Sequence, residues 1–324
     1  MAEYLHLFSS ASTFNDAYAN DYKEPWVSYT VENSGVAYNK KSVPPTPHDY
    51  SQDYLTLVFQ TTGSVFVNSY STDIYLSKDS GQTWVVGELD SLNPGDKVLV
   101  KGDLKQTSLG EGEGLFSYCT GQYSVEGNVM SIYDQSGFRT RTTFDNNNDR
   151  FSFMFAYCSG LTSAENLVLP VTALTDWCYQ GMFNGCYSLT SAPELPATTL
   201  ASNCYNGMFM DCSSLTTAPV LPATTLAESC YGSMFSYCTT LTTAPELPAT
   251  ILAEGCYYDM FNGCSSLNYI KCLATNISAN GSTSYWVSGV ASTGTFVKPS
   301  SADWSSKTGY GNGIPENWTV QDAN

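Results

Sequence analysis

The sequence repeats itself with a period of 26 residues, and this period limits what the chain can fold into. Three units that cover residues 189–266 align without a gap. An earlier unit, 161–188, fits the same frame with two extra residues before Pro170, and a degenerate unit begins at Leu267. One unit is too short to bury its own apolar side chains, so a fixed period of this kind predicts that the units stack as a solenoid.

Each unit contains two kinds of apolar spacing. In the last full unit an extended run ends at Pro245 and Pro248, which lack the amide hydrogen that a sheet or helix uses. Cys256, Met260 and Cys264 then recur every fourth residue, which predicts the apolar stripe of a helix about two turns long. We therefore expect a mainly β fold with short helices, in which units stack at about 4.8 Å.

The frame of the repeat resembles the BspA-type leucine-rich repeat. The units read Leu-Thr-Thr-Ala-Pro near their start and Met-Phe-x-x-Cys-Ser-Ser-Leu near their end. The resemblance covers less than half of the 324 residues and implies an irregular leucine-rich solenoid, used mainly in surface adhesion and binding. The proline-rich middle and a second cysteine per unit depart from the family pattern, the second cysteines being Cys178, Cys204, Cys230 and Cys256.

Nine of the eleven cysteines fall in two columns of the repeat. The first column holds the four cysteines just named, and the second holds Cys158, Cys186, Cys212, Cys238 and Cys264. The repeats contain no histidine and no Cys-x-x-Cys pair, so a zinc site is not expected. Disulfides between units are an alternative, but the favoured interpretation is free thiols that pack as small buried apolar groups.

Composition restricts the partners. The net charge of −17 argues against binding to nucleic acid or to anionic membranes, because both require basic patches. The tyrosine-rich profile, with 14% aromatic residues and 13% charged residues, is typical of extracellular and virion proteins. No apolar run is long enough to span a membrane, and the first residues lack the pattern of a signal peptide. We expect no nucleic-acid partner, no membrane insertion and assembly in the cytoplasm of a host.

Residues 1–48 are expected to show little regular pattern. Two stretches, 24–30 and 36–40, resemble N-terminal segments of structural proteins from phages of gut Bacteroidota, including crAss-like phages. That resemblance implies attachment to the particle or oligomerisation, through Tyr4, Leu5, Leu7, Phe8, Trp26 and Tyr29. The alternative is a flexible tail with one aromatic anchor. Residues 44–47, Pro-Pro-Thr-Pro, predict a stiff extended linker.

Residues 49–135 predict a β-sandwich. Short runs rich in β-branched and aromatic residues alternate with polar turns. The expected strands are 54–60, 64–68, 73–77, 83–88, 97–101, 114–118 and 122–130. Residues 92–96, Leu-Asn-Pro-Gly-Asp, predict a turn in which proline sets φ and glycine supplies a positive φ.

Two motifs invite a functional interpretation. Residues 77–84, Ser-Lys-Asp-Ser-Gly-Gln-Thr-Trp, resemble the Asp-box of sialidases, which is a hairpin that binds its own backbone. The box occurs once and arginines are few, so we expect a structural turn and not a glycosidase remnant. Asp145, Asn147 and Asp149 have the spacing of a calcium loop, but its glycine and glutamate are absent, which favours a solvated turn and no metal.

The end of the repeats changes chemistry. Within the expected solenoid, 136–292, the last unit places Ser282, Trp286, Val287 and Val290 where earlier units have Cys, Met, Phe and Cys. Atypical terminal units are expected, because they must close an open core. Residues 293–324 predict a small β-hairpin cap, with Phe296, Trp304, Trp318 and Val320 covering the last unit.

The inventory of reactive groups argues against an enzyme. The two histidines, His6 and His48, both lie before the repeats, and no glycine-rich phosphate loop is present. A carboxylate pair for glycoside hydrolysis is the remaining alternative, and its candidates are Glu194, Glu228, Glu246 and Glu254. These acids occupy repeat positions, which favours a solvated face. No catalytic residue and no cofactor is expected.

The repeated hydroxyls are the candidate ligand-binding residues. They are Thr190, Ser191, Thr216, Thr217, Thr242 and Thr243. Ordered hydroxyls can bind glycans or a partner protein, although threonine is also common in ordinary strands. We expect a phage virion protein, a head or tail fibre subunit that forms a homo-oligomer, with a trimer favoured, and attaches to other virion proteins through its N-terminal segment. A purely structural capsid or fibre component and a bacterial cell-surface adhesin are the alternatives.

Overall fold

The structure is a computed structural model in which the chain divides into two compact units, Met1–Asp49 and Tyr50–Asn324. It describes the strands at 5–8, 26–31 and 35–40, and residues 48–67, 74–103, 114–145, 151–305, 307 and 311–323. The fold is mainly β with few helices. The helical segments in the described residues are short 3₁₀ turns, namely η1 (Tyr50–Gln52), η2 (Val129–Ile132) and η3 (Phe138–Thr140).

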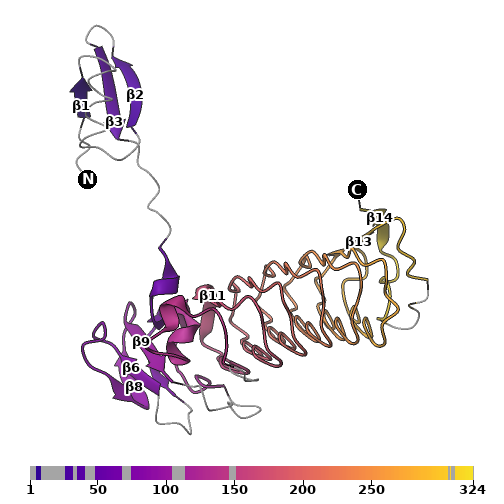
Figure 1. Ribbon diagram of the computed structural model, residues 1–324, viewed down its shortest axis with the longest axis horizontal. Helices are drawn as coiled ribbons and strands as arrows, with labels where there is room; N and C mark the ends of the chain where they lie inside the picture. Colours follow the sequence, from indigo (N-terminus) through magenta and orange to yellow (C-terminus); the bar gives the residue numbers. More distant parts are fainter. Residues whose placement is uncertain are drawn as a thin grey trace. The chain divides into compact units, whose positions relative to one another are not determined.

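The N-terminal unit contains a three-stranded antiparallel sheet (Figure 1). Its strands are β1 (Leu5–Phe8), β2 (Trp26–Val31) and β3 (Gly35–Lys40), in the order β1-β3-β2. The expectation of little regular pattern was therefore wrong. The stretches at 24–30 and 36–40 are rich in β-branched and aromatic residues, which suit paired strands. The predicted linker at 44–47 lies outside the described residues.

The second unit begins with two sheets. A six-stranded sheet has the order β11-β10-β4-β9-β6-β7, and a two-stranded sheet pairs β5 with β8. The first sheet is formed by β4 (Leu55–Phe59), β6 (Ile74–Ser77), β7 (Val85–Val86), β9 (Lys97–Gly102), β10 (Tyr123–Asn128) and β11 (Leu161–Val168). The second is formed by β5 (Gly63–Phe66) and β8 (Glu88–Leu92). The turn at 92–96 is present as predicted, with Gly95 at φ 93°.

One predicted strand is wrong and one strand was missed. Residues 114–118 form turns, because the amide of Ser117 donates to the carbonyl oxygen of Gly114 and the amide of Cys119 donates to that of Phe116. A β-carbon on Gly114 would lie 2.5 Å from the carbonyl oxygen of Ala156, so this segment packs directly on the repeats. Strand β8 was missed because Glu-Leu-Asp-Ser-Leu carries few β-forming residues.

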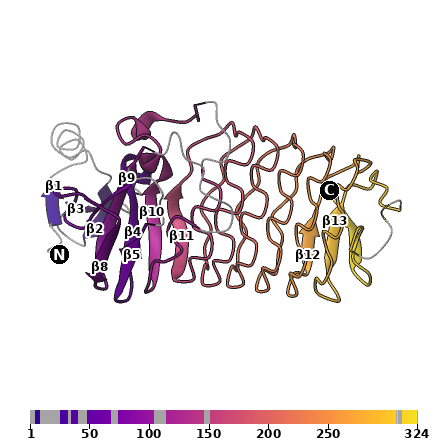
Figure 2. The ribbon, with the colours of Figure 1, turned by 90° about the horizontal axis from the view of Figure 1, so that it is seen from below.

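The six-stranded sheet leads directly into the repeats. Strand β11 belongs to the first repeat and pairs in parallel with β10, with Tyr123 opposite Leu161. The remaining pairs of this sheet are antiparallel. The hydroxyl of Thr162 also donates to the carbonyl oxygen of Tyr123 at 3.0 Å. One sheet and one apolar core therefore cross the expected boundary at residue 135 (Figure 2).

The repeat units stack through parallel backbone hydrogen bonds. The amide of Tyr231 donates to the carbonyl oxygen of Cys256 in the next unit at 3.1 Å, and Phe235 donates to Met260 at 2.9 Å. The amide of Met234 instead donates within its own unit, to Tyr231 at 3.3 Å. Along this side of the stack, alternate amides bond to the next unit and the others close local turns.

The predicted short helix in each unit is wrong. The segment is a run of consecutive turns in which every fourth residue has a positive φ, as at Ser229, Ser233 and Tyr237. An α-helix would direct every amide after its first turn to a carbonyl of the same segment, so it could not give alternate amides to the neighbouring unit. The four-residue spacing of the apolar side chains is thus the period of the turns and not that of a helix.

The interior consists of columns of identical side chains. The tyrosine column and the phenylalanine column stack ring on ring, with centroids of Tyr205 and Tyr231 5.9 Å apart and those of Phe183 and Phe209 5.5 Å apart. Methionines and both cysteine columns are also buried, which confirms the predicted apolar stripe. The columns continue from the first repeat to Trp286, which is fully buried.

The C-terminal residues form one more turn of chain and not a hairpin. Strands β12 (Tyr269–Lys271), β13 (Thr295–Lys298) and β14 (Thr319–Asp322) form a parallel sheet in that order. Parallel pairing requires the chain to travel around the stack between strands, so the predicted hairpin cap is wrong. Phe296, Trp304 and Trp318 are buried as predicted, but Val320 is 47% exposed. Within the described residues, no helix has the length and apolarity to cross a membrane.

Candidate functional site

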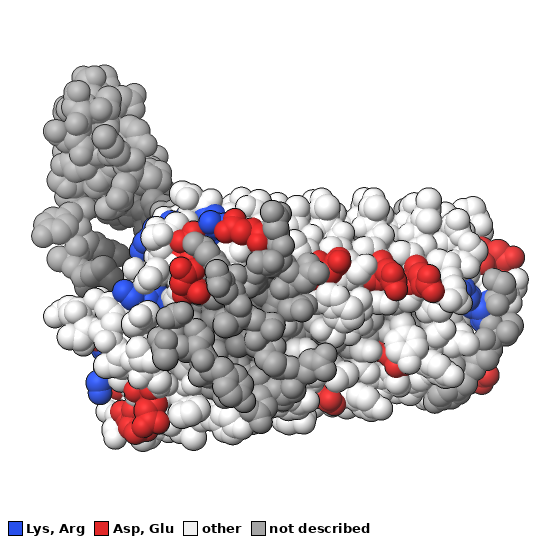
Figure 3. Space-filling view, turned by 60° about the horizontal axis from the view of Figure 1, so that its bottom comes forward, with Lys and Arg blue, Asp and Glu red and all other residues white. Residues whose placement is uncertain are grey.

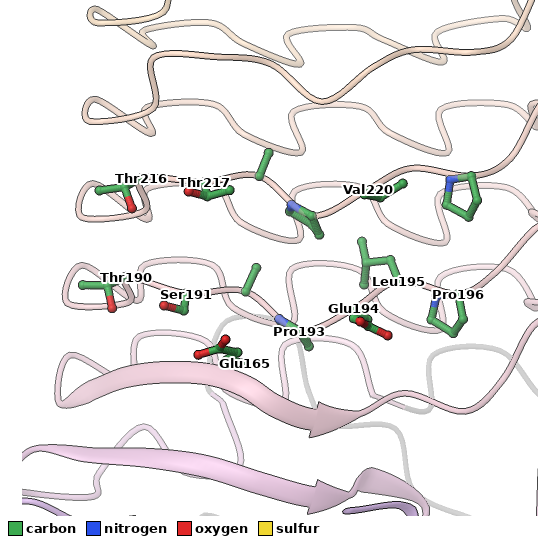
Figure 4. A pocket seen from close by; sticks show the side chains of 14 residues that line it. Glu165, Thr190, Ser191, Pro193, Glu194, Leu195, Pro196, Thr216, Thr217 and Val220 are labelled. Carbon is green, nitrogen blue, oxygen red and sulfur yellow. The ribbon is translucent and has the colours of Figure 1, made fainter. Parts of the chain in front are cut away.

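Four of the six predicted ligand-binding residues lie together in a groove of about 510 Å³ on the side of the repeats. Thr190 and Ser191 come from one unit, and Thr216 and Thr217 come from the next (Figure 4). Thr242 and Thr243 occupy the same position one unit further on and do not line the groove. Equivalent residues of the repeat are therefore in different surroundings.

The groove lies where the first repeat diverges from its neighbour. Parallel bridges join Ser163 to Ser191 and Ala173 to Thr199. Ten residues separate the two bridged positions in the first repeat (173 − 163) and eight in the second (199 − 191). The two extra residues let β11 continue as a regular strand, whereas the equivalent segment of the next unit bends at Pro193 and Pro196. The insertion before Pro170 is visible in the sequence, but its effect on the neighbouring unit is not.

Hydroxyls, prolines and carboxylates line the groove. Thr190 uses its hydroxyl hydrogen to bond to the carbonyl oxygen of Thr162 at 2.9 Å, so its oxygen presents lone pairs outward. The carboxylates of Glu165 and Glu194 lie beside Ser191 and Pro193 respectively (Figure 4). The groove also contains Val220, which is 78% exposed. The groove therefore offers hydrogen-bond acceptors together with the apolar surface of its prolines and Val220.

Acidic residues are the only charged residues of the repeats over a long stretch. Between Phe151 and Ile270 the sequence contains no lysine, arginine or histidine, but it contains eight acidic residues. They are Glu165, Asp176, Glu194, Asp211, Glu228, Glu246, Glu254 and Asp259. In Figure 3, acidic side chains recur along the repeats, and Lys and Arg are visible only toward their two ends. The surface around the groove therefore repels anions.

The candidate carboxylates for glycoside hydrolysis occupy separate surroundings. Glu246 forms an exposed ion pair with Lys271 at 2.9 Å, and Glu254 accepts a hydrogen bond from the side-chain amide nitrogen of Asn280 at 3.1 Å. Glu194 lines the groove, whereas Glu228 does not. All four are exposed, as expected for a solvated face.

The Asp-box is a hairpin that binds its own backbone, as predicted. The carboxylate of Asp79 accepts hydrogen bonds from the amide and hydroxyl of Thr83 and from the hydroxyl of Ser77, at 2.6–3.0 Å. These bonds, those from Thr83 above all, lower the pKa of Asp79 to about 2. The indole nitrogen of Trp84 donates to the carbonyl oxygen of Gly81 at 3.0 Å and closes the turn.

The calcium-loop spacing is only partly described. Asp145 forms an ion pair with Arg141 at 2.8 Å, and Arg141 also pairs with Asp134. Asn147 and Asp149 lie outside the described residues. In the described part of the chain, no group of three or more His, Cys, Asp or Glu side chains is placed to hold a metal ion.

The cysteines are buried free thiols and belong to the packing. Second-column thiols donate to the phenylalanine carbonyl of the preceding unit, as from Cys212 to Phe183 at 3.2 Å and from Cys264 to Phe235 at 2.9 Å. Burial raises the pKa of the Cys264 thiol to about 12. A thiol with so high a pKa is a poor nucleophile, because the thiolate is the reactive form.

The predicted attachment residues fall on two outer strands of the N-terminal sheet. Leu5, Leu7 and Phe8 lie on β1, and Trp26 and Tyr29 lie on β2, with β3 between these strands. Tyr4 lies outside the described residues.

No family model, no curated protein and no solved structure matches the chain. Its function is therefore inferred from the chemistry of these surfaces.

Proposed function

We propose that this protein is a non-catalytic virion component, a head or tail fibre subunit of a phage. In this proposal residues 136–292 form a BspA-type leucine-rich-repeat solenoid, and residues 49–135 form a β-sandwich that acts as a spacer. The groove beside β11 binds a glycan or protein of the host surface or mucosa. The observation that carries the proposal is the convergence of four repeated hydroxyls, two carboxylates and several prolines in that groove.

The packing beneath the groove supports a binding role. The groove residues are attached to units whose backbones bond to each other and whose rings stack in columns. A site on such a framework loses little conformational entropy when a ligand binds. A groove this shallow still implies weak affinity for a single chain. Display on an oligomer supplies avidity, which can exceed the affinity of a single site by about 10²–10⁴.

The charge distribution narrows the class of ligand. With eight acidic residues and no basic residue between Phe151 and Ile270, the repeats disfavour sulfated or sialylated glycans. Neutral glycans fit better, because their hydroxyls can donate to Glu165 and Glu194 and can exchange hydrogen bonds with the threonines.

In the proposal the N-terminal unit attaches the chain to other virion proteins and joins it to sister chains, with a trimer favoured. The protein assembles in the host cytoplasm and resides in the virion. Electron microscopy together with light scattering tests this assembly role. An elongated trimer supports it, and a compact monomer contradicts it.

A matched pair of variants tests the groove. Thr217→Arg places a long cation in the groove, and Thr243→Arg makes the same change at the equivalent position outside it. Chains displayed on beads are exposed to arrayed neutral and sulfated mucin-type glycans and to whole Bacteroidota cells. We expect binding to neutral glycans that Thr217→Arg abolishes and Thr243→Arg retains. Equal binding by both variants, or none by the unaltered chain, contradicts the proposal.

A purely structural role is the second candidate. The 78% exposure of Val220 within the groove favours it, because such an apolar contact suits a protein partner. In that case the chains displayed on beads bind purified virion proteins and not glycans, and Thr217→Arg weakens that binding.

A further inference from the structure

A second recess, of about 530 Å³, lies on the β5–β8 sheet and shares no residue with the groove on the repeats. Its lining comes from β5, from β8 and from the turn segment that precedes β10. The lining residues are Ser64, Val65, Phe66, Glu88, Asp90 and Tyr118. Neither the proposed fibre role nor the Asp-box uses any of them.

Strand alternation places the aromatic and acidic side chains on one face. Phe66 pairs with Glu88 across the two strands, and Val65 pairs with Leu89. Val65 is fully buried, whereas Phe66 is 40% exposed, so the Phe66–Glu88 pair faces outward. The aromatic ring of Phe66 is therefore available to solvent beside the carboxylate of Glu88.

A β-bulge brings a second carboxylate to the same face. The register shifts between Gly63 and Val65, and Ser91 on the opposite strand has φ 57°. Bulges of this kind redirect side chains. Asp90 consequently lines the recess together with Glu88.

The second aromatic ring is held in place by backbone pairing. Ser64 and Thr120 exchange two backbone hydrogen bonds, and their hydroxyls lie 2.9 Å apart. This pairing sets Tyr118 beside Phe66, with the ring centroids 5.9 Å apart and the planes at 89°. Tyr118 is 53% exposed. Two edge-to-face rings thus form one wall of the recess, and two carboxylates on β8 form the other.

The negative charge of Glu88 and Asp90 decides which class of ligand the recess can bind. Within the described residues, the carboxylates of Glu88 and Asp90 form no ion pair and no side-chain hydrogen bond. An anion would be repelled. A hard metal ion requires a full shell of oxygen ligands, which two aromatic rings do not provide. An organic cation satisfies both walls, because its charge meets the carboxylates and its alkyl groups lie against the rings.

We propose that this recess binds an organic cation that carries an alkylammonium group. Phe66 and Tyr118 contact the methyl or methylene groups, and Glu88 and Asp90 neutralise the charge. The hydroxyl of Ser64, which also lines the recess, can accept a hydrogen bond from a ligand N–H or O–H. This inference does not depend on the proposed fibre role.

Choline and its uncharged isostere 3,3-dimethyl-1-butanol form a matched pair of probes. The two share a shape and differ in charge. Calorimetric titration of the full chain is expected to show millimolar binding of choline and binding of the isostere that is at least about tenfold weaker. Equal affinity for the two probes, or no choline binding, overturns the proposal.

Variants assign the binding to this recess. Combining Glu88→Gln with Asp90→Asn is expected to weaken choline binding about tenfold, because it removes the negative wall and leaves the aromatic one. Tyr118→Leu is expected to weaken the binding of both probes. Glu316→Gln, an exposed change elsewhere on the same chain, is the control and leaves binding unaltered. Unchanged choline affinity in the carboxylate variant places the binding elsewhere and overturns the proposal.

Discussion

The ring of Tyr237 lies over Gly263, the residue at the equivalent position of the next unit. A β-carbon on Gly263 would lie 2.5 Å from Cδ1 of Tyr237, and the φ of Gly263 is +75°. Tyr157 and Gly185 repeat this relationship at 2.6 Å. Both tyrosines have positive φ themselves, which side chains normally avoid. An exposed ring in one unit thus packs on the bare backbone of the next.

Gly263→Ala is expected to destabilise the chain by about 2–5 kcal/mol. The positive φ alone costs an L-residue about 1–2 kcal/mol, and the overlap with the Tyr237 ring adds about 1–3 kcal/mol. The loss is measured as a shift in the urea midpoint followed by circular dichroism.

Gly207→Ala is the matched control for this prediction. Gly207 has φ +61°, and a β-carbon there meets nothing within 4 Å, so only the backbone cost of about 1–2 kcal/mol applies. Adding Tyr237→Asp to Gly263→Ala should recover the steric part, because Asp211 occupies the equivalent position one unit earlier. Equal losses in the two single variants would show that the ring contact has no energetic weight.

The sequence predicted the columns of the repeat but not the backbone that carries them. Apolar residues at every fourth position fit both a helix and a run of turns, so Cys256, Met260 and Cys264 could not decide between them. The recurrence of glycine, asparagine and aspartate in this segment could have indicated turns, because these residues adopt a positive φ most readily. Gly181, Gly207, Gly255, Asn203 and Asp211 all have a positive φ. Tyr237, Tyr285 and Trp177 occupy the same kind of position and obscured that signal.

The two surfaces differ in how far the sequence could predict them. The hydroxyls of the groove were identified, because they recur in the repeat, but the shape of the groove depends on how the longer first repeat lies against the next one. The recess at β5–β8 depends on a bulge opposite Ser64 and on the position of Tyr118 in a turn. Neither the bulge nor the position of Tyr118 has a local sequence signal, because both arise from contacts between segments that are distant in the chain.

Asp79→Asn is expected to lower the melting temperature at neutral pH and to flatten its dependence on acid. The folded pKa of Asp79 is about 2, below the ordinary value of 3.8, because Thr83 and Ser77 donate to the carboxylate. A depressed pKa contributes stability above pH 3.8 that is lost as the pH falls toward 2. Melting curves between pH 2 and pH 7 test this, with exposed Asp322→Asn as the control. Parallel pH profiles for the unaltered chain and Asp79→Asn would contradict it.

The buried thiols are expected to make the protein sensitive to alkali. Burial raises the pKa of all eleven, to about 12 for Cys272, whereas an unfolded thiol ionises near 9.0. Between these values the unfolded state holds fewer protons, so each thiol lowers the free energy of unfolding by about 1.4 kcal/mol per pH unit. Together they remove about 15 kcal/mol per unit, the whole stability of a typical domain.

Unfolding is therefore expected by about pH 10.5, with the thiols unreactive toward a thiol reagent at pH 8. Circular dichroism and reagent absorbance follow the two events. Cys256→Ser is the control, because Ser282 already occupies the equivalent position of the next unit, and it should reduce the pH slope by one thiol's share. Rapid labelling of the folded chain at pH 8 would contradict the burial of the columns.

Trp286→Ala is expected to cost about 3–5 kcal/mol and to loosen the C-terminal end of the repeats first. Trp286 is fully buried, its ring stacks on those of Tyr257 at 6.1 Å and Trp304 at 5.5 Å, and its indole nitrogen donates to the carbonyl oxygen of Gly313. Stacked units bond mainly to their neighbours, so the loss should spread inward from this end. Hydrogen exchange should accelerate around β13 while β4 keeps its protection. The control is Trp177→Ala, a change at a 38% exposed ring. Equal acceleration in β4 and β13 would instead mean that the sheet and the repeats unfold as one cooperative body.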